Sequence, residues 1–183
     1  LVVDALMCRG MGEGENFCFG KDRAGDTDLL AILCRQNDIV FRVASMQSLG
    51  GDVISSTRIR DLLSEGQVRR AAELMQHEHL VQGRVVHGDA RGRTIGFPTA
   101  NLDGTSVVIP APGVYAATTE IKKRRWPCAI HIGESPTFES GTAGKIEVHV
   151  IGFEGDLYDQ TLSVRFVDSI REAKRFDSAN DLT

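Results

Sequence analysis

Beyond residue 80, strand-length apolar runs alternate with clusters of glycine, proline and aspartate. The runs are Val81–His87, Gly113–Ile121, Cys128–Ile132, Lys145–Phe153 and Thr161–Phe166. Short strands at regular spacing, separated by turn residues, are typical of antiparallel sheets that close on themselves. This half of the chain is therefore expected to fold as a small antiparallel β-barrel.

The residues before position 80 carry a different, α/β pattern. Asp28–Cys34 is an apolar-rich helical run, and Ile39–Val43 has the composition of a buried strand. Ser55–Thr57 offers N-cap oxygens for a helix that ends at Gly66, and Val68–Met75 follows as a second short helix. The change of pattern predicts two regions, an α/β region followed by the barrel.

The composition excludes some classes of partner. The 183 residues carry a net charge of −4, whereas broad nucleic-acid binding favours a basic surface. No apolar run is long enough to form a membrane-spanning helix, and the chain starts with neither a methionine nor the basic segment of a signal peptide. The four cysteines are scattered, which favours reduced thiols over disulfides or a zinc site. We expect a piece of a longer cytoplasmic protein that acts on small molecules, with no nucleic acid or membrane as partner. An oligomer is compatible with the sequence.

Residues 83–101 combine glycine, arginine and two neutral side-chain oxygens. Glycines allow tight turns and a close approach of the backbone to a ligand, and Arg91 and Arg93 can meet phosphate charge. Thr99 and Asn101 lie two residues apart, so on an extended chain their oxygens share one side. Such oxygens beside an arginine and glycine loop suit a magnesium–nucleotide complex. The alternative is a surface loop between two strands, and the segment lacks the Walker pattern.

Glu147 lies in an alternating run. Strand alternation places Ile146, Val148 and Val150 on one face and Glu147 with His149 on the other. Glu147 is either part of a solvated strand face or a general base held rigidly on a strand. The sequence alone leaves both interpretations open.

Two further segments carry charge or hydroxyl groups. Ser55–Arg60 opens a helix with hydroxyls, free amides and two arginines, which outlines either a phosphate site or an ordinary helix cap. Lys122–Arg125 lies between two strands, where a solvated hairpin tip is favoured over a nucleic-acid patch. No histidine has metal-site spacing with a cysteine or carboxylate.

Many short motifs recur here in the order found in one enzyme family. They are Glu15-Asn-Phe-x-Phe-Gly20, Arg23-x-Gly-Asp26, Ile54-Ser-Ser-Thr-Arg-Ile-Arg60, Gly88-Asp-x-Arg-Gly-Arg93, Gly96-Phe-Pro-Thr-Ala-Asn-Leu102, Gly113-Val-Tyr-Ala116, Ile132-Gly-x-x-Pro-Thr-Phe138, Glu147-Val-His149, Phe153-x-Gly-Asp-Leu-Tyr158 and Ile170-Arg171. Over most of its length the chain resembles the bacterial bifunctional riboflavin kinase/FMN adenylyltransferase (FAD synthetase) family.

The resemblance implies a partial α/β, Rossmann-like nucleotidyltransferase domain over residues 1–78. A six-stranded antiparallel β-barrel riboflavin kinase domain would occupy residues 79–183, truncated at its C-terminus, so that the whole is α+β. The implied reaction is phosphorylation of riboflavin to FMN by ATP with Mg2+, and the parent protein would also adenylylate FMN to FAD. The alternative is a non-catalytic, regulatory flavin or nucleotide binder.

The resemblance also implies roles for individual residues. Glu147 would be the catalytic base for the riboflavin hydroxyl, and Thr99 and Asn101 would hold the metal. The nucleotide of the kinase would be bound by Gly88, Asp89, Arg91, Gly92, Arg93, Gly96, Pro98, Thr99 and Asn101. The phosphates of the adenylyltransferase reaction would be bound by Asn16, Ser55, Ser56, Thr57 and Arg58.

The chain departs from the family pattern in two respects. The His-x-Gly-His motif of the adenylyltransferase does not occur in the sequence, and Cys8–Gly14 is expected to be too short for the strand before Asn16. The family usually has asparagine where His131 stands and glycine where Asp159 stands. Neither of these two changes removes an implied catalytic group.

Overall fold

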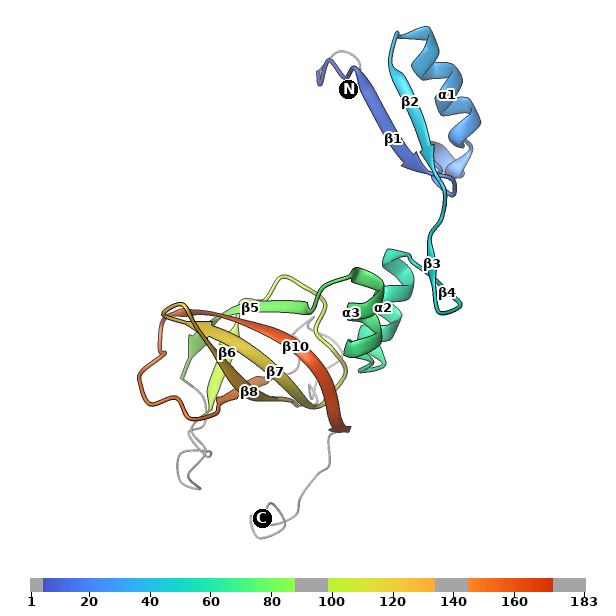
Figure 1. The fold of residues 1–183 in the computed structure, drawn as a ribbon. Coiled ribbons are helices and arrows are strands. Elements are labelled where there is room, and N and C mark those ends of the chain that lie inside the picture. Colours follow the sequence, from blue (N-terminus) through green and yellow to red (C-terminus); the bar gives the residue numbers. More distant parts are fainter. Residues whose placement is uncertain (1–4, 88–98, 134–144, 173–183) are drawn as a thin grey trace. The chain divides into compact units, whose positions relative to one another are not determined.

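The computed structural model describes residues 5–87, 99–133 and 145–172 (Figure 1). The chain forms two compact units, Leu1–Ile54 and Ser55–Thr183. The implied Gly/Arg nucleotide loop, Gly88 to Pro98, lies outside the described residues.

The first unit is built around a parallel pair of strands. Strands β1 (Gly10–Gly14) and β2 (Val40–Ala44) pair in parallel from Gly10 opposite Val40 to Gly14 opposite Ala44. A 3-10 turn η1 (Lys21–Arg23) and helix α1 (Thr27–Gln36) connect them, and the short strands β3 (Ser48–Leu49) and β4 (Asp52–Val53) follow. The Asp26 carboxylate starts α1 by accepting the Leu29 amide at 2.9 Å. This β–α–β order agrees with the α/β pattern of the sequence.

Two expectations for this unit were wrong. The segment Cys8–Gly14 does contain a strand, β1, because main-chain pairing with β2 compensates for the low strand preference of its glycines. Strand β2 forms but is not buried: Val40 is 63% exposed and Val43 49%. The cause is that α1 alone, among the described α-helices of this unit, packs on the two-stranded sheet.

The second unit contains the predicted barrel. Its strands are β5 (His79–Val86), β6 (Ala100–Asp103), β7 (Gly113–Ile121), β8 (Arg124–Ile132), β9 (Ile146–Val150) and β10 (Thr161–Glu172). The described strands close in the order β10-β5-β6-β9-β8-β7, with every neighbouring pair antiparallel. The small antiparallel barrel predicted from the sequence pattern is therefore confirmed, with the six strands that the resemblance implies.

Side chains from alternate strand positions fill the interior of the barrel. Along β5 and β7, buried residues alternate with more exposed ones, as the two faces of a barrel strand require. Tyr115 and Phe166 meet edge to face inside, with ring centroids 5.3 Å apart. Lys122 and Lys123 form the β7–β8 turn, so Lys122–Arg125 begins as the predicted hairpin tip and continues into β8.

Two helices belong to the same unit as the barrel: the second packs on β10 and β5, and the first packs against the second (Figure 1). They are α2 (Ser56–Ser64) and α3 (Val68–Met75), both at the predicted positions. The Ser55 hydroxyl caps α2 by accepting the Arg58 amide at 3.1 Å, and Gly66 ends the turn with φ +76°. The boundary between the compact units thus lies between Ile54 and Ser55. The boundary between the nucleotidyltransferase and kinase domains, which the resemblance places after residue 78, stays a prediction.

Candidate functional site

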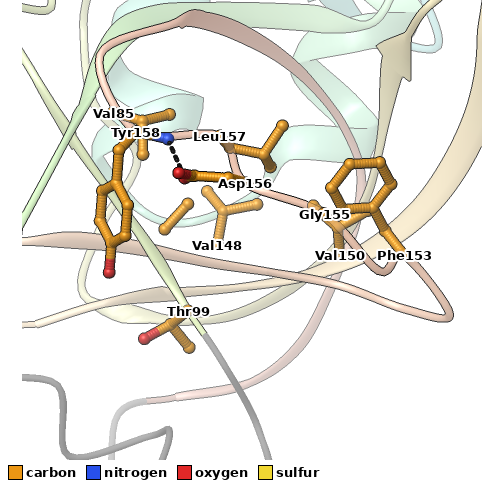
Figure 2. A pocket seen from close by; sticks show the side chains of 10 residues that line it. Val85, Thr99, Val148, Val150, Phe153, Gly155, Asp156, Leu157 and Tyr158 are labelled. Atoms are coloured by element: carbon orange, nitrogen blue, oxygen red, sulfur yellow. Dashed lines mark hydrogen bonds between the residues drawn. The ribbon is translucent and has the colours of Figure 1, made fainter.

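A pocket opens among three barrel strands and the segment that follows β9. Its volume is about 360 Å³. Its lining residues are Val85, Thr99, Ala100, Val148, Val150, Phe153, Gly155, Asp156, Leu157 and Tyr158. Figure 2 shows the Thr99 hydroxyl at one side of this group, with the Phe153 and Tyr158 rings on either side of Asp156 and Leu157. Aliphatic and aromatic side chains and polar groups both contribute to the walls, which suits a flat ring with polar substituents such as a nucleotide base.

The pocket segment is fixed to the barrel by several interactions. Asp156 accepts the Tyr158 amide at 2.9 Å, and the Asp159 amide donates to the Val85 carbonyl at 2.9 Å. The Tyr158 ring stacks on His87 at a centroid distance of 3.8 Å. A Cβ at Gly155 would lie 2.7 Å from the Phe153 ring, so a larger residue at this position would displace that ring. The wall is therefore largely preformed.

Two predicted site residues lie side by side on neighbouring strands. Asn101 on β6 is the register partner of Glu147 on β9. The side chain of Asn101 is buried, and its Oδ1 atom has no hydrogen-bond partner. Thr99, two residues earlier, lines the pocket. Such a buried oxygen without a partner is what a metal ligand would leave, because Mg2+ prefers oxygen donors.

Glu147 is a half-buried carboxylate with two partners. Its Oε2 lies 3.4 Å from Nδ1 of His131, and its Oε1 lies 3.1 Å from Nζ of Lys145. The hydrogen bond from His131, together with the hydrogen bond and charge of Lys145, lowers the pKa of Glu147 to about 2 although burial opposes this shift. Glu147 is therefore ionised at neutral pH and able to accept a proton. His149 shares its face, as the alternation predicted, because Ile146, Val148 and Val150 are buried.

The residues that the resemblance implies for the adenylyltransferase reaction occur in both compact units. Ser55 caps α2, and Ser56, Thr57 and Arg58 form the first turn of that helix. Asn16 is an exposed residue that follows β1 in the first unit. Their role as a phosphate site stays a prediction.

Sequence reasoning assigned no role to His131 or Lys145. His131 becomes a neighbour of Glu147 only through the register of β8 against β9, which no local pattern reveals. The motif from Phe153 to Tyr158 is part of the family resemblance, but only the structure shows that it lines the pocket.

The remaining candidate groups of the sequence are cysteines, possible metal ligands and the arginines of the basic segment. Within the described residues, no three His, Cys, Asp or Glu side chains cluster as a metal site, and the four cysteines there are free thiols. Arg124 lies over the Trp126 ring at 4.2 Å, and Arg125 pairs with Glu78 at 3.1 Å. None of the described helices has the length and hydrophobicity needed to span a membrane.

Comparison with known proteins adds independent information. The family model described as riboflavin kinase (Flavokinase) matches residues 75–183. The bifunctional riboflavin kinase/FMN adenylyltransferase of Pseudomonas fluorescens is 35% identical over 182 residues, covering 100% of this chain and 58% of the relative. Its counterpart in Escherichia coli K12 is 36% identical over 185 residues, again with 100% and 58% covered.

A solved structure is also similar. A Streptococcus pneumoniae protein described as a macrolide-efflux protein matches with a TM-score of 0.78 and 34% identity, over 92% of this chain and 54% of that chain. The chain thus spans little more than half the length of the proteins that it matches. On the family match and the barrel that underlies it, the chain belongs to the riboflavin kinase family.

Proposed function

We propose that this chain transfers the γ-phosphoryl group of ATP to the terminal ribityl hydroxyl of riboflavin, forming FMN and ADP. The observation that carries the proposal is the Asn101–Glu147 pair on adjacent strands. The pocket lies on the other face of β9, where Val148 and Val150 line it, and it is also lined by Thr99, two residues before Asn101. The family names agree with this reaction.

The pocket is assigned to the nucleotide. Aromatic and aliphatic walls from Phe153, Tyr158 and Val148 suit the adenine ring, and the polar rim at Thr99 suits the phosphates. The glycine and arginine segment 88–98 precedes Thr99 directly in the sequence. Its arginines are assigned to phosphate charge, which the transition state of phosphoryl transfer requires to be neutralised.

Thr99 and Asn101 would hold the magnesium ion that accompanies ATP. The unpartnered Asn101 Oδ1 fits this role, because Mg2+ accepts neutral oxygens and leaves room for phosphate ligands. When bound, the ion offsets negative charge on the phosphates.

Glu147 is assigned as the general base. Its carboxylate accepts the proton of the riboflavin hydroxyl while that oxygen bonds to the γ-phosphorus and the bond from γ-phosphorus to the bridging oxygen of ADP breaks. The low pKa keeps the carboxylate ionised at neutral pH, and it also makes Glu147 a weak base, so its contribution depends on its position next to the hydroxyl. Its strand position, between buried Ile146 and Val148, restricts its movement as positioning demands.

The names of the relatives include a second activity, FMN adenylyltransferase. We assign Ser55–Arg58, at the start of α2, to the ATP phosphates of that reaction. Asn16, in the first unit, keeps the phosphate-binding role that the resemblance implies. The 183 residues contain no His-x-Gly-His motif, so we expect FMN rather than FAD to accumulate with this chain alone.

The test is incubation with riboflavin, ATP and Mg2+, with FMN and FAD resolved by chromatography. Glu147→Gln should lower kcat by about 10²–10⁴-fold, the usual cost of losing a general base. The matched control is Glu120→Gln, an exposed carboxylate on β7, which should keep parental turnover. Flavin binding without FMN formation by the parent chain would instead identify a non-catalytic binder.

A further inference from the structure

Three side chains form a row across the outside of the barrel. Asn101 on β6, Glu147 on β9 and His131 on β8 are consecutive register partners. His131 therefore approaches Glu147 from the side opposite Asn101. Its Nδ1 atom lies 3.4 Å from Oε2 of the carboxylate.

We propose that His131 is a positioning residue, which holds the Glu147 carboxylate in the orientation that accepts the proton of the substrate hydroxyl. The proposal rests on the proposed function, because it assigns the work of His131 entirely to Glu147. The Nδ1–H group donates to Oε2 and fixes the carboxylate plane. The second lone pair of each carboxylate oxygen stays available to the substrate.

The two partners of Glu147 differ in how firmly they can hold it. Lys145 reaches Oε1 through four methylene groups, and a lysine ammonium is a mobile point charge. His131 has a planar ring on a short stem, and its strand position is fixed on both sides, opposite Val114 of β7 and opposite Glu147 of β9. Orientation is therefore assigned to His131, and Lys145 adds mainly charge.

The role has a clear energetic reason. A glutamate side chain has three rotatable bonds, and only part of its freedom is removed by the half-buried strand face. Proton transfer needs the base within hydrogen-bond reach of the hydroxyl, and displacement of a reacting group by about 1 Å can cost roughly 10²-fold in rate. A directional hydrogen bond to one carboxylate oxygen prevents that displacement.

The first test compares two variants of His131. His131→Leu removes the donor, and we expect kcat to fall about tenfold while KM for ATP and for riboflavin changes less than about twofold. His131→Asn restores an N–H donor near the position of Nδ1, and turnover should return to within about threefold of the parent. The imidazole side chain is 48% exposed, so both variants should fold. The matched control is His77→Leu, at an exposed histidine outside the barrel strands.

The second test repeats His131→Leu in the Glu147→Gln background. If His131 acts through Glu147, the double variant should be no slower than Glu147→Gln alone. A further tenfold loss in that background, or unchanged kcat in His131→Leu, would overturn the positioning role. A rise in KM with kcat unchanged would also overturn it, because it would place His131 in substrate binding. Near-parental turnover of Glu147→Gln would contradict the proposed base itself, which separates the two failures.

Discussion

Asn101 keeps a buried carbonyl oxygen without a partner, which a purely structural residue would be expected to avoid. Leaving such an atom unsatisfied costs about 1–3 kcal/mol. Asn101→Leu preserves the shape and removes the polar group, so we expect a protein at least as stable as the parent that binds Mg-ATP at least about tenfold more weakly. Calorimetry with Mg-ATP and thermal unfolding measure the two effects.

The affinity for ATP in the absence of metal distinguishes loss of a metal ligand from damage to the nucleotide pocket. This affinity should be similar in the parent and in Asn101→Leu. Thr99→Val tests the other proposed ligand in the same way. Unchanged Mg-ATP affinity in both variants would remove the metal assignment.

His79 provides a pH-dependent contribution to stability. It is buried, its Nε2 lies 2.8 Å from the Val108 carbonyl oxygen, and burial is the main cause that lowers its pKa below 6.5. The unfolded chain therefore binds a proton at a higher pH than the folded chain does. This contribution is fully present above about pH 6.5 and is lost as the pH falls toward the folded-state pKa.

We therefore expect His79→Gln to flatten the fall of unfolding free energy between about pH 7.5 and the acid side of the histidine range. Denaturant titrations at several pH values measure the slope. His77→Gln removes only the smallest of the causes that shift the pKa of His79, so it should change the slope much less than His79→Gln does. An equal slope in parent and His79→Gln would show that His79 does not carry the effect.

Local patterns predicted the face on which Glu147 lies but not what surrounds it. The alternation of Ile146, Val148 and Val150 depends on a period of two along one strand, which the sequence displays directly. The contact with His131 depends on which residues of β8 and β9 face each other across a sheet. That register is set by the whole barrel, so it could not be derived from either segment alone.

The β7–β8 hairpin turns through two lysines in the left-handed region. Lys122 has φ 51° and Lys123 has φ 63°, between the paired residues Ile121 and Arg124. A two-residue turn with two positive φ angles favours Asn-Gly, and other residues are strained there by about 1 kcal/mol each. Lys122→Asn with Lys123→Gly should therefore raise the free energy of unfolding by about 1 kcal/mol.

Equilibrium denaturation measures this gain. Lys122→Ala with Lys123→Ala removes the same two charges without relieving the backbone, so it should give no stabilisation. Equal gains in both double variants would attribute the effect to charge rather than to φ.

Elements with local signals were found, and elements that depend on distant partners were not. Helices α2 and α3 carry their caps and stop residues in the sequence, and both were located correctly. The sequence predicts no strand within Cys8–Gly14, because the formation of β1 depends on pairing with β2, some 30 residues later. Strand β2 was expected to be buried, but the burial of a parallel strand depends on layers supplied by other segments.

The proposed kinase site belongs entirely to one of the two compact units. Thr99, Asn101, Glu147 and the pocket lie within Ser55–Thr183, which also contains α2 and α3. A protein of residues 55–183 should therefore phosphorylate riboflavin with kcat/KM within a few-fold of the full chain. Loss of most activity on this deletion would show that the first unit contributes to the kinase site.

A cut at residue 79 should behave differently, although it retains every proposed kinase residue. It removes Leu62, Leu63, Val68 and Leu74, each at most 2% exposed, and the Arg69–Asp168 ion pair that joins α3 to β10. It also removes the Leu63 carbonyl that accepts the Ala111 amide at 3.0 Å. Burial of each aliphatic side chain contributes about 1.5–3 kcal/mol, against a total domain stability of roughly 5–15 kcal/mol. Residues 79–183 should therefore unfold at a much lower temperature than residues 55–183 in thermal scans. Equal unfolding temperatures would contradict the assignment of α2 and α3 to the barrel unit, because helices that can be removed without loss are not part of its core.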